Sequence, residues 1–556
     1  MSERIFIGVA WPYANGPLHL GHIAGAYLPA DIFARYHRLK GDDVLMVSGS
    51  DQHGTPITIR AALESTSPRE IASKYHQQFL DCWQKLGISF DLFTTTGTAN
   101  HAQVTHDIFI TLLNKGYIYK GKMLGAYCPG CQRYLPDRYL EGTCPYCGFP
   151  KARGDECDEC GKPLEPAALE NVHCYLCSTP ARFEMVEHFF LRLSAFQDRL
   201  KAWIKEQSQW RRQVLSTTWK FLDEELKDRA ITRDINWGVT VPQPGFEQKR
   251  IYVWFEAVIG YLSASKEWAR LRGDDTAWQA FWQGDSKSFY FVGKDNIFFH
   301  TLIWPAMLMG CGGLSLPYDV PANEFLTIEG RRLSTSRNWA VWLPDYLERY
   351  DPDPVRYALA ASMPETADSD FTWYKFVHRN NDELVATYGN LAHRVLSFTY
   401  RNFTGVVPSP GELDEQSQAL LCKAETTLDE VDRALHRCRF REAMRHAMSL
   451  AQETNRYLDV QSPWKAIRET PDAAAKSTYI ALSVLSALKT VLYPFIPFSS
   501  EKLHTLLGFT GNVREAGWKF EPPRPGQKIR RPQPLFVKLD DSIIEQETSR
   551  IGCVSY

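Results

Sequence analysis

The chain has 556 residues, which predicts three to four domains at about 150 residues per domain. Hydrophobic residues make up 44% and charged residues 23% of it, near the globular average, which excludes a wholly disordered or collagen-like chain. The net charge of -2 excludes a protein that is basic over its whole surface, but it leaves open a local nucleic-acid patch, because a patch depends on how the charges are distributed.

The N-terminal segment has the pattern of a βαβ unit. Residues 4–10 form a short apolar, β-favouring run, and residues 20–39 place apolar side chains at helical spacing after a turn-rich stretch. A second apolar strand is expected at residues 44–47. Strand, helix and strand in this order predict a parallel sheet. The Gly-rich dinucleotide fingerprint is absent after the first strand.

The sequence His19-Leu20-Gly21-His22 stands where the first strand meets its helix. A helix N-terminus offers free N–H groups and a positive dipole end, which together bind phosphate. Two histidines three residues apart lie on one face of the first turn, and Gly16 and Gly21 let a flat ligand approach the backbone. Open α/β sheets bind ligands at the carboxyl ends of their strands. This position therefore favours a binding site over two surface histidines in a loop.

Eight of the 13 cysteines form four C-x-x-C pairs between residues 128 and 177. Such clustering indicates metal ligation in a reducing compartment, not a disulfide framework. Four thiolates complete a closed tetrahedral zinc site, so the array predicts two structural zinc ions. Gly130, Gly148 and Gly161 suit the tight turns between ligands. Spacing alone does not decide which pairs share an ion.

The rest of the chain shows an α/β pattern first and a helical pattern after it. Residues 250–254 and 288–292 are each expected as a strand followed by a helix, so an α/β sheet is interrupted by the cysteine-bearing insert. From about residue 376 the pattern is helical, and amphipathic segments such as 382–400 and 425–458 predict a helix bundle. Pro-rich residues 521–525 open a tail that is expected to be extended.

No targeting or membrane segment is evident. The N-terminus lacks the basic and apolar regions of a signal peptide. The most apolar late stretch, residues 479–498, is interrupted by Lys489, prolines and hydroxyls, which is typical of a core helix. A cytoplasmic location is the expectation.

Residues 12–22 resemble the signature of class I aminoacyl-tRNA synthetases, in the form found in methionyl-tRNA synthetases. Residues 49–56 are similar to the second block of that family, residues 252–261 to its methionine-pocket strand, and residues 293–300 to its next sheet motif. The resemblance covers nearly the whole chain.

Residues 331–336 resemble the mobile K-M-S-K-S loop, which holds the ATP phosphates in this family. Arg332 stands at the first lysine position, where it keeps the charge and can bind phosphate bidentately. Thr335 stands at the second and carries no charge, and a branch of the family similarly has threonine there. The charge missing at this position would then come from Arg331 or Arg337. Residues implied to bind ATP are Asn15, Gly16, His19, Gly21, His22, Arg332, Ser334 and Thr335, of which His19, His22, Arg332 and Thr335 are implied to be catalytic.

The resemblance also implies a methionine pocket, a zinc pairing and an RNA site. The residues expected to bind methionine are Trp11, Tyr13, Asp51, Trp254, Ala257, Val258, Tyr261, Asn296 and His300, with Asp51 accepting the substrate ammonium. One zinc ion would be held by the inner pairs Cys144, Cys147, Cys157 and Cys160, and the second by the outer pairs Cys128, Cys131, Cys174 and Cys177. Asn390, Arg394 and Trp464 would contact the CAU anticodon, with Trp464 stacking on an unpaired base.

The implied architecture is a Rossmann-like parallel-sheet catalytic domain, split by a zinc-knuckle insert and followed by an all-α anticodon-binding bundle. Its expected parts are residues 1–115 and 232–325 for the two catalytic halves, 116–231 for the insert, 326–375 for the stem-contact region, 376–520 for the bundle and 521–556 for the extended tail.

The implied activity is a ligase that makes methionyl-adenylate from L-methionine and ATP and transfers the methionyl group to methionine tRNA, initiator tRNA included. Mg²⁺ would accompany ATP, and a monomer is expected. Two alternatives stay open: a synthetase-like paralogue with another amino acid or acceptor, and a zinc-ribbon nucleic-acid-binding module without catalysis.

Overall fold

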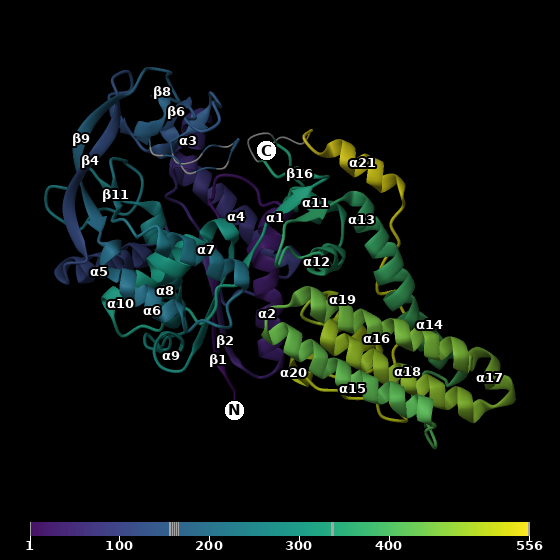
Figure 1. Ribbon diagram of the computed structural model, residues 1–556. Helices are drawn as coiled ribbons and strands as arrows, with labels where there is room; N and C mark the ends of the chain where they lie inside the picture. Colours follow the sequence, from purple (N-terminus) through teal and green to yellow (C-terminus); the bar gives the residue numbers. More distant parts are fainter. Residues whose placement is uncertain are drawn as a thin grey trace.

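The computed structural model describes residues 2–154, 157, 159–160, 162, 164, 166–334 and 338–553. A sheet-based part, an insert that projects from it and a long helical part follow one another along the chain, and the insert and the helical part extend to opposite sides (Figure 1). No helix among the described residues is both long enough and apolar enough to cross a membrane.

The central sheet has five parallel strands, as the βαβ pattern predicts. Its order is β14-β13-β1-β2-β3, and every neighbouring pair is parallel. β1 therefore has a later strand on each side, and the switch in strand order falls between β1 and β13, which is where open α/β sheets bind ligands. The strands are β1 (Arg4–Val9), β2 (Asp43–Ser50), β3 (Leu92–Thr95), β13 (Lys287–Gly293) and β14 (Ala322–Asn323).

The helix predicted after the first strand is confirmed, with one irregular turn. α1 (Leu20–His22) runs through a π-helical turn, η1 (Ile23–Tyr27), into α2 (Leu28–Leu39). The remaining helices around the sheet are α3 (Thr55–Leu63), α4 (Pro68–Leu86), α5 (Ala99–Asn114), α8 (Val253–Leu271), α9 (Gln279–Trp282) and α10 (Trp304–Cys311), the last preceded by the π-helical η6 (Phe299–Ile303).

The segment predicted as the pocket strand is a helix, so this prediction is wrong. Only Arg250–Ile251 form a short strand, β12, and α8 begins at Val253. The aromatic and β-branched residues of this stretch favour a strand locally. However, Phe255, Ile259 and Leu262 recur at helical spacing and are all buried, so burial of one helix face decides the structure.

The insert is an antiparallel ribbon that carries the cysteine-rich turns at its far end (Figure 1). β4 (Ile118–Cys128) pairs along its length with β9 (Arg182–Leu191). The other elements are β5 (Arg133–Leu135), β6 (Leu140–Thr143), β7 (Ala152–Arg153), β8 (Glu170–Cys174), α6 (Gln197–Ile204), α7 (Arg212–Asp223), β10 (Arg229–Ala230) and β11 (Thr232–Arg233).

The chain after the sheet passes through a small three-stranded sheet into the predicted helix bundle. The expected single segment 425–458 is two helices, α15 and α16, separated by a turn in which Cys438 has a positive φ of 52°. The elements are β15 (Leu326–Ile328), β16 (Arg331–Arg332), α11 (Leu343–Arg349), α12 (Pro352–Ala361), β17 (Ser369–Phe371), α13 (Trp373–His378), the π-helical η7 (Arg379–Gly389), α14 (Asn390–Asn402), α15 (Glu415–His436), α16 (Phe440–Gln461), α17 (Pro463–Glu469), α18 (Pro471–Leu492), α19 (Pro497–Leu506) and α20 (Val513–Ala516).

The C-terminal tail is not extended throughout. It forms α21 (Ser542–Arg550), which packs beside α13 (Figure 1). Glu547 is almost fully buried there and accepts hydrogen bonds from Arg349 (2.8 Å) and from the Tyr350 hydroxyl (2.9 Å). These contacts, which the sequence pattern does not reveal, stabilise the helix.

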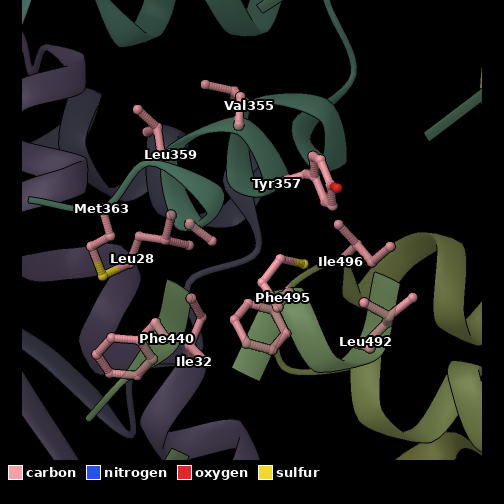
Figure 2. Packing of buried hydrophobic residues seen from close by; sticks show 14 of the residues in the cluster. Leu28, Ile32, Val355, Tyr357, Leu359, Met363, Phe440, Leu492, Phe495 and Ile496 are labelled. Atoms are coloured by element: carbon pink, nitrogen blue, oxygen red, sulfur yellow. The ribbon is translucent and has the colours of Figure 1, made fainter. Parts of the chain in front are cut away.

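One hydrophobic core joins the sheet-covering helices to the bundle. Figure 2 shows Val355 and Leu359 of α12 above Leu28 of α2, and Ile32 of α2 next to a side chain of the bundle. The labelled bundle side chains are Phe440 of α16, Leu492 of α18, and Phe495 and Ile496 after it. This shared core holds the two parts of the molecule together.

Candidate active site

The two histidines predicted at the start of the helix lie against each other. His19 is the N-cap of α1, and the rings of His19 and His22 are stacked with centroids 3.7 Å apart. The backbone N–H of His22 donates to His19 Nδ1 (3.3 Å), and the backbone N–H of His19 donates to His22 Nδ1 (3.2 Å). This reciprocal capping fixes both rings at the carboxyl end of β1.

The charge state of both rings follows from these bonds and from burial. Burial, followed by the neighbouring His22, lowers the pKa of His19 well below its usual value, and burial lowers the pKa of His22 to about 4. Both rings are therefore neutral near pH 7. Since each Nδ1 accepts a hydrogen bond, the ring proton of each histidine is on Nε2. The pair offers two N–H donors beside a positive helix end, which suits phosphate oxygens.

Leu333, in the described part of the K-M-S-K-S-like loop, lies over this helix start. A Cβ at Gly21 would overlap with the Leu333 side chain and would lie 3.0 Å from His19 Nδ1. Arg332 is exposed on β16, and Ser334 pairs through its backbone with Trp339 (3.1 and 2.9 Å). Thr335 and Arg337 lie outside the described residues.

The other expected ATP-binding residues lie in the turn before α1. The Asn15 carbonyl accepts a hydrogen bond from Arg60 (2.9 Å). A Cβ at Gly16 would meet only this Arg60 side chain, at 3.7 Å, so the backbone there is open to a close neighbour.

Asp51 lies directly after β2, beside the turn that follows β1. Its backbone bonds to Pro12 (2.8 Å) and Ala14 (2.9 Å) join the two strand ends. The Asp51 side chain is 2% exposed, and burial, followed by the charge of Glu256, raises its pKa to about 7. A buried carboxylate of this kind suits a cationic ligand group.

Aromatic side chains from α8 and from the first turn surround Asp51. Trp254 Nε1 donates to the Tyr13 hydroxyl (2.6 Å). Trp11 lies between Gly49 of β2 and Gly260 of α8, because a Cβ at either glycine would overlap with its ring. Of the remaining predicted residues on α8, Val258 is buried and Ala257 is partly exposed.

Tyr261 and His300 form the back of this region. Both are buried, and the Tyr261 hydroxyl donates to His300 Nε2 (2.8 Å). His300 Nδ1–H donates to the Asn296 carbonyl (2.9 Å), which leaves Nε2 as the acceptor. Burial lowers the pKa of His300 to about 4, so this chain of hydrogen bonds is neutral. The region combines aromatic side chains with few polar groups, which suits an apolar amino-acid side chain.

Sequence reasoning missed several residues of the same region. His53 Nδ1 donates to the buried carboxylate of Glu256 (2.7 Å), and His101 lies behind it. Trp237 reaches over the turn and donates to the Gln52 carbonyl. The one available signal was Glu256 itself, a carboxylate on the face of α8 that is otherwise buried.

The eight paired cysteines form two quartets, in the pairing that the resemblance implies. Within each quartet the four Sγ atoms all lie within 4.8 Å of one another. The Sγ atoms of Cys131 and Cys177 are 3.3 Å apart, and those of Cys144 and Cys160 are 3.9 Å apart. Tetrahedral zinc with Zn–S bonds of about 2.3 Å needs sulfurs about 3.8 Å apart, so both quartets fit a structural ion. The quartets are Cys128, Cys131, Cys174 and Cys177, and Cys144, Cys147, Cys157 and Cys160.

The glycine expectation for these turns needs a correction. The left-handed residue follows the second cysteine of a pair, with φ of 74° at Gly148, 49° at Gln132 and 57° at Ser178. Gly130 has no positive φ. Instead, a larger residue is excluded at this position because a Cβ would lie 2.5 Å from the Thr179 hydroxyl. Gly161 lies outside the described residues.

Two of the three predicted anticodon residues meet at the far end of the bundle. The Arg394 guanidinium on α14 lies 4.3 Å from the centre of the Trp464 ring on α17 and 3.6 Å from an oxygen of Asp459. Ser462, with a φ of 40°, makes the sharp corner before α17. Asn390 is exposed one helical turn before Arg394. The three residues lie on a connected surface.

Comparisons with known proteins agree with this arrangement. A family model described as "tRNA synthetases class I (M)" matches residues 5–396, and one described as "Anticodon binding domain of methionyl tRNA ligase" matches residues 407–555. The chain is 59% identical to a "Methionine--tRNA ligase" of Dehalococcoides mccartyi, over 99% of this chain and 100% of the relative. It is 51% identical to a protein of the same name from Roseiflexus castenholzii, over 99% of each chain.

A solved structure agrees with the sequence comparisons. The fold matches Mycobacterium tuberculosis methionyl-tRNA synthetase in complex with methionyl-adenylate with a TM-score of 0.80 and 26% identity, covering 96% of this chain and 100% of the other. With a parallel sheet, a cysteine-bearing insert and a helical bundle matched from end to end, this chain belongs to the methionyl-tRNA synthetases of class I.

Proposed function

We propose that this chain activates L-methionine with ATP and transfers the methionyl group to the 3′ end of methionine tRNA, including initiator tRNA. The observation that carries the proposal is the meeting of three groups at the switch point of the sheet, in a chain that matches methionyl-tRNA synthetases along its whole length. These groups are the His19–His22 helix start, the Asp51 carboxylate and the aromatic face of α8.

In the first step the methionine carboxylate attacks the α-phosphate of ATP, and methionyl-adenylate and pyrophosphate form. No side chain acts as a nucleophile, so catalysis comes from positioning and electrostatics. Asp51 holds the ammonium group, while Trp254, Tyr261 and their neighbours enclose the thioether side chain. The Nε2–H groups of His19 and His22 donate to phosphate oxygens.

The loop that begins at Arg331 closes the phosphate side of the site. Arg332 supplies a cation for the phosphates, and Leu333 packs on Gly21, so the loop and the helix start are positioned together. ATP binds with Mg²⁺. In the second step the 2′-hydroxyl of the terminal adenosine of the tRNA attacks the methionyl carbonyl of the adenylate; the ester forms, the acyl–phosphate bond breaks and AMP leaves.

The two cysteine quartets each hold one zinc ion, which maintains the shape of the insert near the acceptor end of the tRNA and takes no part in the chemistry. Support comes from the mutual distances of the sulfurs. The six-part division of the chain, the monomeric state and the cytoplasmic location remain predictions from the sequence.

The bundle recognises the CAU anticodon through Asn390, Arg394 and Trp464. Support comes from the contact of Arg394 with the Trp464 ring on an exposed end of the bundle. Trp464→Ala should raise the KM for tRNA about tenfold or more, since base stacking is worth about 1–3 kcal/mol, and should leave ATP–pyrophosphate exchange unchanged. Tyr400→Ala, an exposed aromatic change on α14, is the control. Equal effects of both variants would contradict the assignment.

The experiment that tests the activity is ATP–pyrophosphate exchange with each of the twenty amino acids in turn. Exchange with methionine alone is expected, followed by charging of methionine tRNA. Exchange with another amino acid, or with none, would replace the proposal with a synthetase-like paralogue.

A further inference from the structure

A buried carboxylate next to the candidate ammonium site has no role in the chemistry described above. Glu256 lies on α8 with no exposed surface. Its Oε1 accepts a hydrogen bond from His53 Nδ1 at 2.7 Å. Among the described residues Oε2 accepts no hydrogen bond, and His101 Nε2 lies 4.0 Å from it. Burying an ionised carboxylate is costly unless a cation faces it.

His101 is not that cation. The Ser263 hydroxyl donates to the Gly260 carbonyl (3.0 Å), so its oxygen accepts the hydrogen bond from His101 Nδ1–H (2.9 Å). Burial, followed by the charge of His53, lowers the pKa of His101 to about 3, and its ring is neutral. His53 is therefore the cationic partner of Glu256 within the described structure. Although burial opposes it, the Glu256 carboxylate raises the pKa of His53.

The His53 residue connects this carboxylate to the candidate substrate site. Its backbone N–H donates to Asp51 Oδ1 at 3.0 Å, only two residues away. The side chain of His53 is thus held by Glu256, and its peptide group orients Asp51. One residue thus contacts two buried carboxylates, Glu256 through its ring and Asp51 through its backbone N–H.

We infer that Glu256 is a positioning residue for methionine: it holds His53, and through His53 it orients the Asp51 carboxylate that receives the substrate ammonium. The inference rests on the proposed function, because it concerns the same amino-acid site. Glu256, which lies within the block 252–261, thereby has a specific role in amino-acid binding.

Because of this arrangement, Glu256 should affect how methionine binding depends on pH. The titratable groups that face Glu256 are His53, His101 and, beyond His53, Asp51. Burial and then Glu256 raise the pKa of Asp51 to about 7, so protonation of Asp51 weakens methionine binding as the pH falls below about 7. Removing the negative charge of Glu256 must lower the pKa of Asp51, and the loss of affinity then shifts to lower pH.

The test is Glu256→Gln, which keeps the size and one acceptor oxygen and removes the charge. At pH 8, where Asp51 is ionised in both proteins, we expect the KM for methionine in pyrophosphate exchange to rise about tenfold. The kcat should stay within about threefold and the KM for ATP should not change. At pH 6 the ratio of the two KM values should fall toward one, because only the wild type has lost the Asp51 charge.

Glu267→Gln is the matched control, since Glu267 lies on the same helix, is partly buried and accepts a hydrogen bond from Thr94 (2.9 Å) away from the pocket. Glu256→Asp keeps the charge, and it should keep the wild-type pH dependence even if its KM is raised. This variant also tests the inference if Glu256→Gln does not fold.

An unchanged KM at pH 8, or a KM ratio that is the same at both pH values, would overturn the inference and indicate a purely structural role. The two proposals fail differently. If the wild-type protein shows no exchange with methionine, the proposed function is wrong. If the wild type exchanges methionine and the variants behave like the control, only the role of Glu256 is wrong.

Discussion

His19 and His22 face the candidate phosphate site as neutral rings. The attraction for phosphate then comes from the helix end and from the arginine-bearing loop, while the histidines contribute directed N–H donors. Stacking and reciprocal capping hold both rings in place before a ligand arrives, with centroids 3.7 Å apart. Such preorganisation lowers the cost of orienting the donors when charge develops on the phosphates.

A prediction at the residue scale concerns Gly21. In Gly21→Ala the added Cβ would overlap with Leu333 and crowd His19, so both the loop and the ring must shift. We expect the rate of pyrophosphate exchange to fall about 100-fold, because small misplacements of catalytic groups have effects of this size. The matched control is Gly25→Ala in the same helix, where a Cβ meets nothing within 4 Å. It should keep the wild-type rate and raise stability by up to about 1 kcal/mol. Equal rates for the two variants would exclude the proposed contact.

The cysteine turns are elements with little hydrophobic core of their own. The hydrophobic clusters around the two quartets are small, and two cysteines of the second quartet are exposed. A small unit of this kind is usually folded only with its metal bound. Bound zinc would therefore stabilise the insert and not the central sheet.

The prediction for this element is a metal count. The wild-type protein, purified under reducing conditions, should contain two zinc ions per chain by elemental analysis. Cys131→Ser and Cys144→Ser should each lower the count to about one, since each removes one thiolate from a different quartet. Cys422→Ser, an exposed cysteine outside the quartets, should leave it at two. Loss of both ions in a single variant would show that the quartets are not independent.

At the scale of the whole molecule, a buried ion network joins the sheet to the bundle. Arg356 of α12 donates to Asp31 of α2 (2.6 Å) and to the carbonyls of Pro494 (2.9 Å) and Phe495 (2.8 Å) after α18. Arg35 adds a second bond to Asp31 (2.9 Å). The Asp31–Arg356 pair is fully buried. Phe495, whose carbonyl takes part in this network, belongs to the core shown in Figure 2, so the network and the core together hold the bundle against α2 and α12.

Asp31→Asn should destabilise the folded protein by about 3–5 kcal/mol in urea unfolding at pH 7, since it leaves Arg356 buried without a countercharge. Burial alone would raise the pKa of Asp31, but Arg35, Arg356 and Ser89 lower it to about 2, from a usual value of 3.8. The lowered pKa means that this stabilisation is present above about pH 4 and is lost as the pH falls toward 2. Asp43→Asn, which removes an exposed pair with Arg4, should cost less than about 1 kcal/mol. Similar losses for both variants would argue against the network.

Local sequence patterns determined the parallel sheet, the helix start with its two histidines and the metal-type cysteine pairs. These features depend on periodicity and on spacing within a few turns, which neighbouring residues fix by themselves. The carboxyl end of the first strand predicted a ligand site at His19, whereas Asp51 was assigned to that site by family resemblance. The assignment of the aromatic face to methionine came from family resemblance, since an aromatic run alone is also typical of a core.

The tertiary structure alone decided the features that depend on residues far apart in the chain. α8 is a helix because burial of one face outweighs the strand preference of its aromatic and β-branched residues. α21 is stabilised by contacts with residues about 200 positions earlier, and His53 meets Glu256 across 203 positions. No local pattern encodes such meetings, because packing of the whole chain determines which buried charges face each other.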